Sequence, residues 1–356
     1  MQKTKSFFKT IILIILAVLG LVYAKSIKRD IADAIYICLE SIIPSLYFFM
    51  IVSSLLMKSG LSNAFQKYLS PITKKLFGFD GRIFAVFLFS QIGGYPVGIR
   101  LLSDLYTEKT ITQKQADIFS CFCYSSGPAF ILGIVCNKAQ FAPILISNIT
   151  ANLLLAFVLC KINARSIKSE KNTKNTNIKS NGADIVVYTQ SSAKSLFCVC
   201  AMILFMRALI CIARNIGMIS SLCHLSQNLF GMDYTDAYSF WCCFFEVSSV
   251  NQVSFCFLRA ALLSFGGICV IMQIFSLCSF KISFAKFCMA RLIAALISGF
   301  ICLILFDETI QSASISAMAN AYSAKFSINS IYSLLLLLMS CILLTKNSRQ
   351  TKNNVI

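Results

Sequence analysis

Long apolar runs separated by short polar connections make up most of the chain. Because about 20 apolar residues in helical form cross a bilayer, each run predicts a membrane helix. The runs do not alternate between apolar and polar positions, which disfavours a transmembrane β-barrel. The pattern therefore predicts an all-α polytopic membrane protein with about eight to ten hydrophobic segments. The segments are expected at residues 10–24, 31–57, 83–102, 116–136, 141–161, 195–219, 236–257, 258–278, 284–306 and 328–344.

Two segments of the first half are interrupted near their centres by glycine, proline and polar residues. Such residues stop regular helical hydrogen bonding, and lipid offers no water in its place. Irregular backbone at that depth persists only where it is buried in protein or lines a polar cavity, so both interruptions are candidate substrate-binding segments. Their residues are Gln91, Gly93, Gly94, Tyr95, Pro96 and Gly98 in the first, and Tyr124, Ser125, Ser126, Gly127 and Pro128 in the second.

The second half contains two interrupted segments at corresponding places. One carries Glu246, Ser248 and Ser249, and the other carries Gly266 and Gly267, with Gln273 about two helical turns further on. Paired interruptions at matching positions are typical of transporters built from inverted repeats. We therefore expect an N-terminal helix with its flank (1–30), a first repeat (31–162), a disordered polar linker (163–190), a second repeat (191–306), and a loop, last helix and basic tail (307–356).

The basic residues indicate how the chain is oriented. They gather at the N-terminus, in the linker and in the C-terminal tail, which the positive-inside rule places in the cytoplasm. With both termini inside and one crossing by the first helix, each repeat crosses the membrane an odd number of times. At least one segment per repeat is then expected not to cross fully, and the interrupted segments are the natural re-entrant hairpins. The first apolar run also has the features of a signal peptide, but the many later spans favour an uncleaved helix.

Composition agrees with this class and excludes others. The chain is 57% hydrophobic and only 13% charged, and its formal charge of +18 is explained by the basic flanks, so we expect no nucleic-acid binding. The 17 cysteines lie mostly inside apolar runs, without paired CxxC spacing and with a single histidine. They are interpreted as small apolar helix residues, and no metal and no cofactor are expected.

Three motifs together resemble a known family. They are the run from Gln91 to Gly98, the run from Ser126 to Gly133, and the run from Ser264 to Ile268 with Gln273. They resemble the YlbJ (SpoVV) family of sporulation integral membrane proteins, which belongs with the nucleoside-recognition (Gate) domain proteins. The repeats of those proteins are similar to those of concentrative nucleoside transporters. The resemblance implies a role in endospore formation in the outer forespore membrane, and the movement of dipicolinic acid towards the spore.

Broken helices suit such an anion. A half-helix N-terminus attracts negative charge, and helices beginning near Pro96 and Pro128 would receive carboxylates. Tyr95 and Tyr124 would supply aromatic surface, and the four serines further hydrogen bonds. The structural alternative is that glycine and serine merely allow close helix packing. That alternative explains isolated positions better, whereas mirrored breaks containing proline and polar groups favour binding.

Glu246 is the single residue whose position points most strongly to a functional role. A carboxylate among aromatic residues costs about 3 kcal/mol or more to insert in a membrane unless it is neutralised or paired. Glu246 is therefore either a protonatable coupling site or a structural partner of Arg207, Arg259 or a helix end. Gln91 and Gln273 are equally compatible with substrate contact and helix–helix hydrogen bonding. Arg100 and Arg259 end spans near breaks, where they balance substrate charge or reach the interface.

The leading hypothesis is a secondary-type carrier that moves a small anion by alternating access, coupled to protons or Na⁺. The rival is a non-transporting sporulation scaffold or assembly factor that keeps a transporter-like fold. An enzyme is not expected, because the chain has no HExxH or GxSxG motif and no acid pair at membrane depth. Nothing in the pattern indicates an oligomeric state.

Overall fold

A computed structural model describes residues 2–58, 61–135, 138–168 and 183–305. Within these ranges every regular element is a helix, and five helices are long and apolar enough to cross a membrane, or six if one bent pair counts as a span. The predicted all-α polytopic fold is thus confirmed. The five spans are Ala24–Met57, Gln140–Ile162, Ile185–Asn215, Cys256–Leu277 and Phe284–Leu305. The expected span 328–344 lies outside the described residues.

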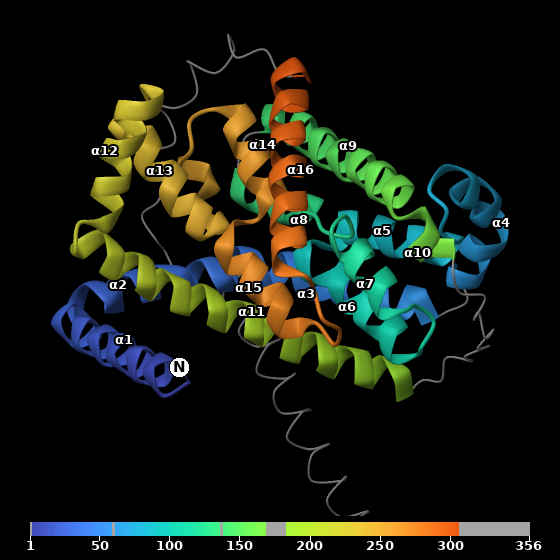
Figure 1. The fold of residues 1–356 in the computed structure, drawn as a ribbon, viewed down its shortest axis with the longest axis horizontal. Coiled ribbons are helices and arrows are strands. Elements are labelled where there is room, and N and C mark those ends of the chain that lie inside the picture. Colours follow the sequence, from blue (N-terminus) through green and yellow to red (C-terminus); the bar gives the residue numbers. More distant parts are fainter. Residues whose placement is uncertain (1, 59–60, 136–137, 169–182, 306–356) are drawn as a thin grey trace, which may run out of the picture.

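The order of elements in the first half is repeated in the second (Figure 1). Each half has a long apolar helix, a shorter helix, two interrupted helix pairs and a final long helix. The first half contains α2 (Ala24–Ile37), η1 (Cys38–Ile42), α3 (Ile43–Lys58), α4 (Leu61–Leu76), α5 (Gly81–Gly93), α6 (Tyr95–Thr107), α7 (Gln113–Ser120), α8 (Pro128–Val135) and α9 (Lys138–Ile162). The second contains α11 (Ala183–Asn215), α12 (Met218–Phe230), α13 (Tyr234–Phe245), η2 (Val247–Gln252), α14 (Cys256–Phe265), α15 (Gly267–Leu277) and α16 (Phe284–Leu305).

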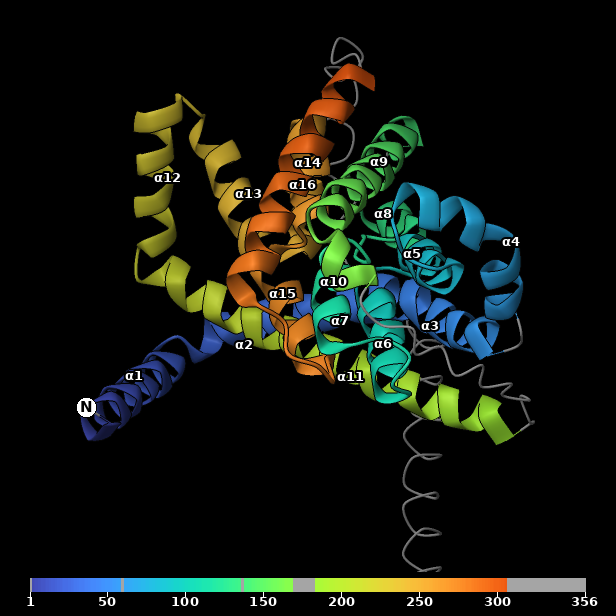
Figure 2. The ribbon, with the colours of Figure 1, turned by 45° about the vertical axis from the view of Figure 1, so that its right-hand side comes forward.

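Corresponding elements occupy corresponding places. The long helices pack in pairs, α11 against α2 and α3, and α16 against α9. The shorter helices α4 and α12 lie at opposite ends of the molecule (Figures 1 and 2). The first interrupted helix of each half starts on an aspartate N-cap: Asp80 accepts a hydrogen bond from the Arg82 backbone N–H, and Asp233 from that of Thr235. The interrupted segments lie between these outer helices.

Several boundaries differ from the predicted ones. The first apolar run forms α1 (Gln2–Val22), whose apolar part, Phe7–Val22, is shorter than a full span. Helix also enters both ends of the segment expected to be a disordered linker, as α10 (Ala164–Lys168) and as the first turns of α11. The reason at α11 is that residues 185–187 are apolar and continue the helix backwards from the predicted span.

The helix α4 precedes the first interrupted segment and meets α5 at an angle of 91°. The hinge is held by close backbone packing, because a Cβ on Gly81 would lie 2.1 Å from the carbonyl oxygen of Phe65. The basic residues Lys74 and Lys75 fall in the last turn of α4, where positive charge is favourable.

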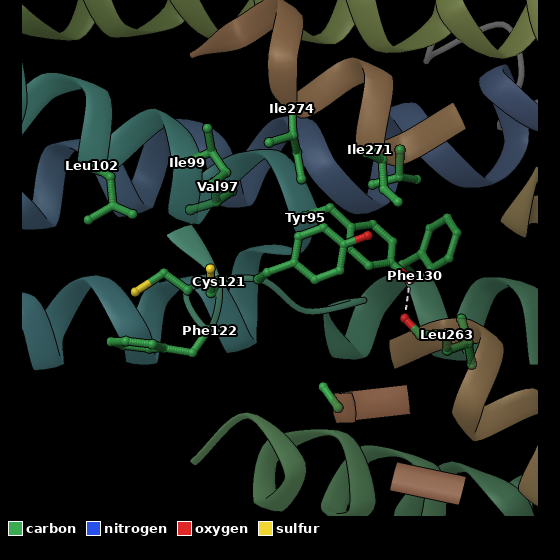
Figure 3. Close-up of a cluster of buried hydrophobic side chains, with 14 of the residues drawn as sticks. Tyr95, Val97, Ile99, Leu102, Cys121, Phe122, Phe130, Leu263, Ile271 and Ile274 are labelled. Atoms are coloured by element: carbon green, nitrogen blue, oxygen red, sulfur yellow. Dashed lines mark hydrogen bonds between the residues drawn. The ribbon is translucent and has the colours of Figure 1, made fainter. Parts of the chain in front are cut away.

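One continuous buried core connects the two halves. Figure 3 shows its centre, where Tyr95 of α6 packs among Phe130 of α8 and Ile271 and Ile274 of α15. Phe122, from the interruption between α7 and α8, stacks on Phe79 with ring centroids 6.0 Å apart. The interrupted segments are therefore inside the protein, as irregular backbone at membrane depth requires.

Candidate functional site

The first break separates α5 from α6 at a single residue. Gly94 has a φ of 88°, in the region that L side chains rarely adopt, and it ends one helix and begins the next. Pro96 lies in the first turn of α6, where its missing N–H costs no hydrogen bond. Gly98 permits a very close approach, because a Cβ there would lie 2.1 Å from the Cys123 carbonyl oxygen. A Cβ on Gly93 would meet Val97 at 2.7 Å.

The second break touches the first through backbone. Residues 121–127 connect α7 to α8 without helical structure, and a Cβ on Gly127 would lie 2.9 Å from the Gly94 nitrogen. Gly127 itself has a φ of 31°. Because no side chain separates them, the two breaks of the first half form a direct backbone crossing.

The breaks of the second half meet in the same way. Glu246 ends α13 and begins η2, while Gly266 and Gly267 separate α14 from α15 with φ values of 87° and 75°. A Cβ on Gly267 would lie 3.2 Å from the carbonyl oxygens of Cys243 and Phe244. Each half therefore brings its own two breaks together.

Two tyrosines join the halves. The Tyr95 hydroxyl donates to the Leu263 carbonyl at 2.7 Å, and the Tyr124 hydroxyl donates to the Phe265 carbonyl at 2.7 Å. Both acceptors lie in the last turn of α14, whose carbonyls lack helical partners. The two rings are 4.9 Å apart between centroids. The predicted aromatic residues thus meet, but their hydroxyls are used to connect the breaks.

Replacing Tyr124 with phenylalanine is expected to lower the free energy of unfolding by about 1–2 kcal/mol, because the Phe265 carbonyl stays buried without its donor. Thermal unfolding of the detergent-purified protein measures the loss. Tyr106→Phe is the matched control, since the Tyr106 ring packs on Phe280 away from the breaks. Equal melting temperatures for both variants would contradict the role given to the Tyr124 hydroxyl.

Arg291 is the central residue that the sequence reasoning missed. It lies in the middle of α16, is fully buried, and stacks over the Tyr124 ring at 4.5 Å. Its guanidinium donates to the Cys121 carbonyl (2.8 Å), to Asn152 Oδ1 (3.0 Å) and to the Ser264 carbonyl (3.0 Å). These acceptors belong to the second breaks of both halves and to α9. The sequence feature that could have identified Arg291 is a single arginine inside a long apolar run.

Asn152 completes this centre. Its amide donates to the Tyr124 carbonyl at 2.8 Å and to Gln91 Oε1 at 3.2 Å. Asn148 lies one turn earlier on the same face of α9, as the spacing predicts, and is also fully buried. Gln91 therefore forms a helix–helix hydrogen bond here, one of the two roles proposed for it.

Glu246 has a cationic partner. Its carboxylate accepts from the Ser248 backbone N–H at 2.9 Å and from the Ser248 hydroxyl, and lies 3.3 Å from Arg207 Nε of α11. Of the partners considered from the sequence, both Arg207 and a helix end are present, since Glu246 is the N-cap of η2. Arg259 instead donates to the Gln140 side chain and the Val253 carbonyl.

The other predicted residues lie either at the breaks or away from them. Ser125, Ser126 and Ser249 are buried at the breaks. Among the residues that the structure describes, the hydroxyls of Ser125 and Ser126 have no hydrogen-bond partner. Gln273 lies further along α15, where it donates to Cys269 Sγ at 3.2 Å and reaches the Val199 carbonyl at 3.5 Å.

Arg100 is also removed from the breaks. It is buried on α6 and donates to the hydroxyls of Ser191 and Ser192 on α11. Across the residues that the structure describes, no group of three histidine, cysteine or acidic residues is arranged to hold a metal ion.

Comparison with known proteins identifies the family. Residues 39–225, just over half of the chain, match the nucleoside-recognition family called Gate. The chain belongs to this family. The Gate match includes the first two breaks and Arg207 but ends before Glu246, Gly266 and Arg291. The resemblance stated from the motifs is therefore confirmed at the level of the family.

A curated relative of this Gate protein is the sporulation integral membrane protein YlbJ of Bacillus subtilis. The two are 32% identical over 96 residues, which is 27% of this chain and 24% of that relative. The match thus spans about a quarter of the relative's length. No solved structure matches the chain.

Proposed function

We propose that this membrane protein is a secondary-type transporter that moves a small anionic metabolite by alternating access at the crossing of its helix breaks. One observation carries the proposal: the breaks of both halves meet around Arg291, a fully buried cation. A buried charge is costly unless it is compensated, and intramembrane charges are typical of substrate and ion pathways. An anionic substrate would supply that compensation during transport.

The breaks supply the movement that alternating access needs. Interrupted helices end hydrogen bonding at the crossing, so the half-helices on either side can tilt without breaking a continuous ladder. In this conformation Tyr124 and Ser126 have no exposed surface, which corresponds to a closed site. Opening towards one side or the other would separate one pair of breaks at a time. The repeated order of elements supports two repeats of opposite orientation in the membrane.

For the substrate we propose dipicolinic acid, moved across the outer forespore membrane during sporulation, with both termini of the chain in the cytoplasm. The printed name of the relative YlbJ, a sporulation membrane protein, supports the setting. The chemistry supports the substrate class, since dipicolinate carries two carboxylates on a flat ring that suits the tyrosine pair. Glu246 is the proposed coupling group for a proton or Na⁺.

Uptake into vesicles tests the proposal. Purified protein in liposomes loaded with Tb³⁺ is expected to give a luminescence increase when dipicolinate is added outside, with a rate that saturates with dipicolinate concentration. Protein-free vesicles made with the same lipids give the leak rate. A rate indistinguishable from that leak, from protein shown to be folded by size-exclusion chromatography, would overturn the transport function.

The close packing of the helix breaks favours a second function, that of a scaffold. The crossings are backbone to backbone, and Gln91, Gln273 and Glu246 already have protein partners. These contacts suit a non-transporting sporulation scaffold that keeps the fold. A cysteine introduced at position 249 distinguishes the two, because Gly94, Gly127 and Gly267 have positive φ values and closely packed backbone that a side chain would disturb. A transporter is expected to make this cysteine react with an aqueous reagent beyond the level given by the native cysteines, and dipicolinate is expected to protect it, whereas a scaffold leaves it unreactive.

A further inference from the structure

We propose that Arg291 recognises a carboxylate of the transported substrate and so makes this member of a nucleoside-recognition family selective for anions. This inference rests on the transport function proposed above and goes beyond it by naming the side chain that binds the negative charge of the substrate. It starts from the surroundings of one fully buried guanidinium.

Within the residues that the structure describes, the charge of Arg291 has no anionic partner. Its acceptors within the described residues are carbonyl, amide and hydroxyl oxygens, from Cys121, Asn152 and Ser264. The side chain also stacks on the Tyr124 ring, which attracts a cation through its π face. Neutral oxygens and a ring stabilise the charge only partly. By contrast, Arg207 already has the Glu246 carboxylate at 3.3 Å.

One donor of Arg291 remains unused. Its Nε–H has no hydrogen-bond partner among the described residues, although the atom is buried. Buried donors in native proteins nearly always have acceptors, so this N–H can take an acceptor that a ligand supplies. A carboxylate is the acceptor that best matches the geometry of a guanidinium.

A second buried polar atom without a partner belongs to Ser125, the residue after the Tyr124 that stacks on Arg291. Its hydroxyl has no hydrogen-bond partner in the described part of the chain. Ser125 lies three residues before Pro128, the first residue of α8, whose N-terminal N–H groups attract negative charge. A dianion would therefore bind the Arg291 guanidinium through one carboxylate. Its other carboxylate would bind the Ser125 hydroxyl and the N-terminus of α8.

The same contacts link binding to movement. Arg291 bridges the Cys121 carbonyl in the first half and the Ser264 carbonyl in the second, so it joins the second breaks of the two halves. A substrate carboxylate competes with these neutral carbonyls for the same cation, because charge-assisted hydrogen bonds are about twice as strong as neutral ones. Binding of the anion would then loosen the connection that must open during transport.

The experiment compares dipicolinate with its uncharged isostere, pyridine-2,6-dicarboxamide, by calorimetric titration of the detergent-purified full-length protein. The wild type is expected to bind dipicolinate at least about 30-fold more tightly than the diamide, and Arg291→Gln is expected to lose that preference. Arg291→Lys, which keeps the charge, should retain part of it. Arg82→Gln is the matched control, since Arg82 is a buried arginine beside Asp80, away from the breaks.

The outcomes separate this inference from the transport function. If the wild type and Arg291→Gln both prefer dipicolinate to the same degree while transport persists, the role of Arg291 is wrong and the transporter stands. If the wild type binds both compounds equally, the inference fails without needing any variant to fold. If the wild type neither binds nor transports dipicolinate, the proposed substrate itself fails.

Discussion

Gly98→Ala is expected to destabilise the protein by about 3 kcal/mol or more and to leave little of it folded in detergent, because overpacking against backbone cannot relax locally. The added Cβ would lie 2.1 Å from the Cys123 carbonyl oxygen and 2.7 Å from Ser90 Cβ. The two breaks of the first half would have to move apart to admit one methyl group. The fraction of monodisperse protein in size-exclusion chromatography, and its melting temperature, measure the effect.

Gly133→Ala is the matched control for that substitution. Gly133 is also helical, in α8, but an added Cβ would meet only Ser41, at an ordinary distance of 3.7 Å. Alanine favours the helix over glycine by up to about 1 kcal/mol, so this variant should be as stable as the wild type or slightly more stable. If Gly98→Ala behaved like Gly133→Ala, α6 and the 121–127 connection could not be packed as described.

Arg207→Leu is expected to cost about 3–5 kcal/mol, because it leaves the Glu246 carboxylate buried without its cation. The Glu246 side chain is only 2% exposed, and its remaining partners are the Ser248 N–H and hydroxyl. The double variant Arg207→Leu/Glu246→Leu removes both charges and should recover most of the loss. Melting temperatures of the single and double variants form the cycle. A double variant less stable than either single variant would contradict the ion pair.

The same pair separates a structural from a coupling role for Glu246. If the carboxylate carries the coupling ion, Glu246→Gln should abolish uptake driven by a proton or Na⁺ gradient while substrate exchange at equal concentrations continues. If Glu246 only stabilises the start of η2, both activities should fall together with the amount of folded protein. Vesicles with dipicolinate on both sides measure exchange, and vesicles with an imposed gradient measure coupling.

The pattern of the chain predicted the fold class and the positions of the breaks, because both depend on local residues. Gly94, Gly127 and Gly266 interrupt apolar runs, and interruption is visible without knowledge of packing. These features concern which residues abandon helical geometry, and composition along the chain reports that directly.

The partners of polar side chains could not be predicted in the same way. Glu246 had two candidate cations, Arg207 and Arg259, and only the packing of α11 against the first break of the second half selects Arg207. Arg291 was overlooked because a single arginine in a long apolar helix has no local companion. Its importance arises from acceptors at Cys121, Asn152 and Ser264, which are 170, 139 and 27 residues away in sequence.

The meeting of Tyr124 and Gly266 also constrains how this family can diverge. The Tyr124 hydroxyl lies 1.6 Å from where a Cβ of residue 266 would be, so a tyrosine at one position excludes every side chain at the other. A family member with a smaller residue at position 124 has room for a side chain at position 266. That position could then be asparagine, which tolerates a positive φ. The two positions, 142 apart in the chain, should therefore change together in descent, with tyrosine inherited only alongside glycine.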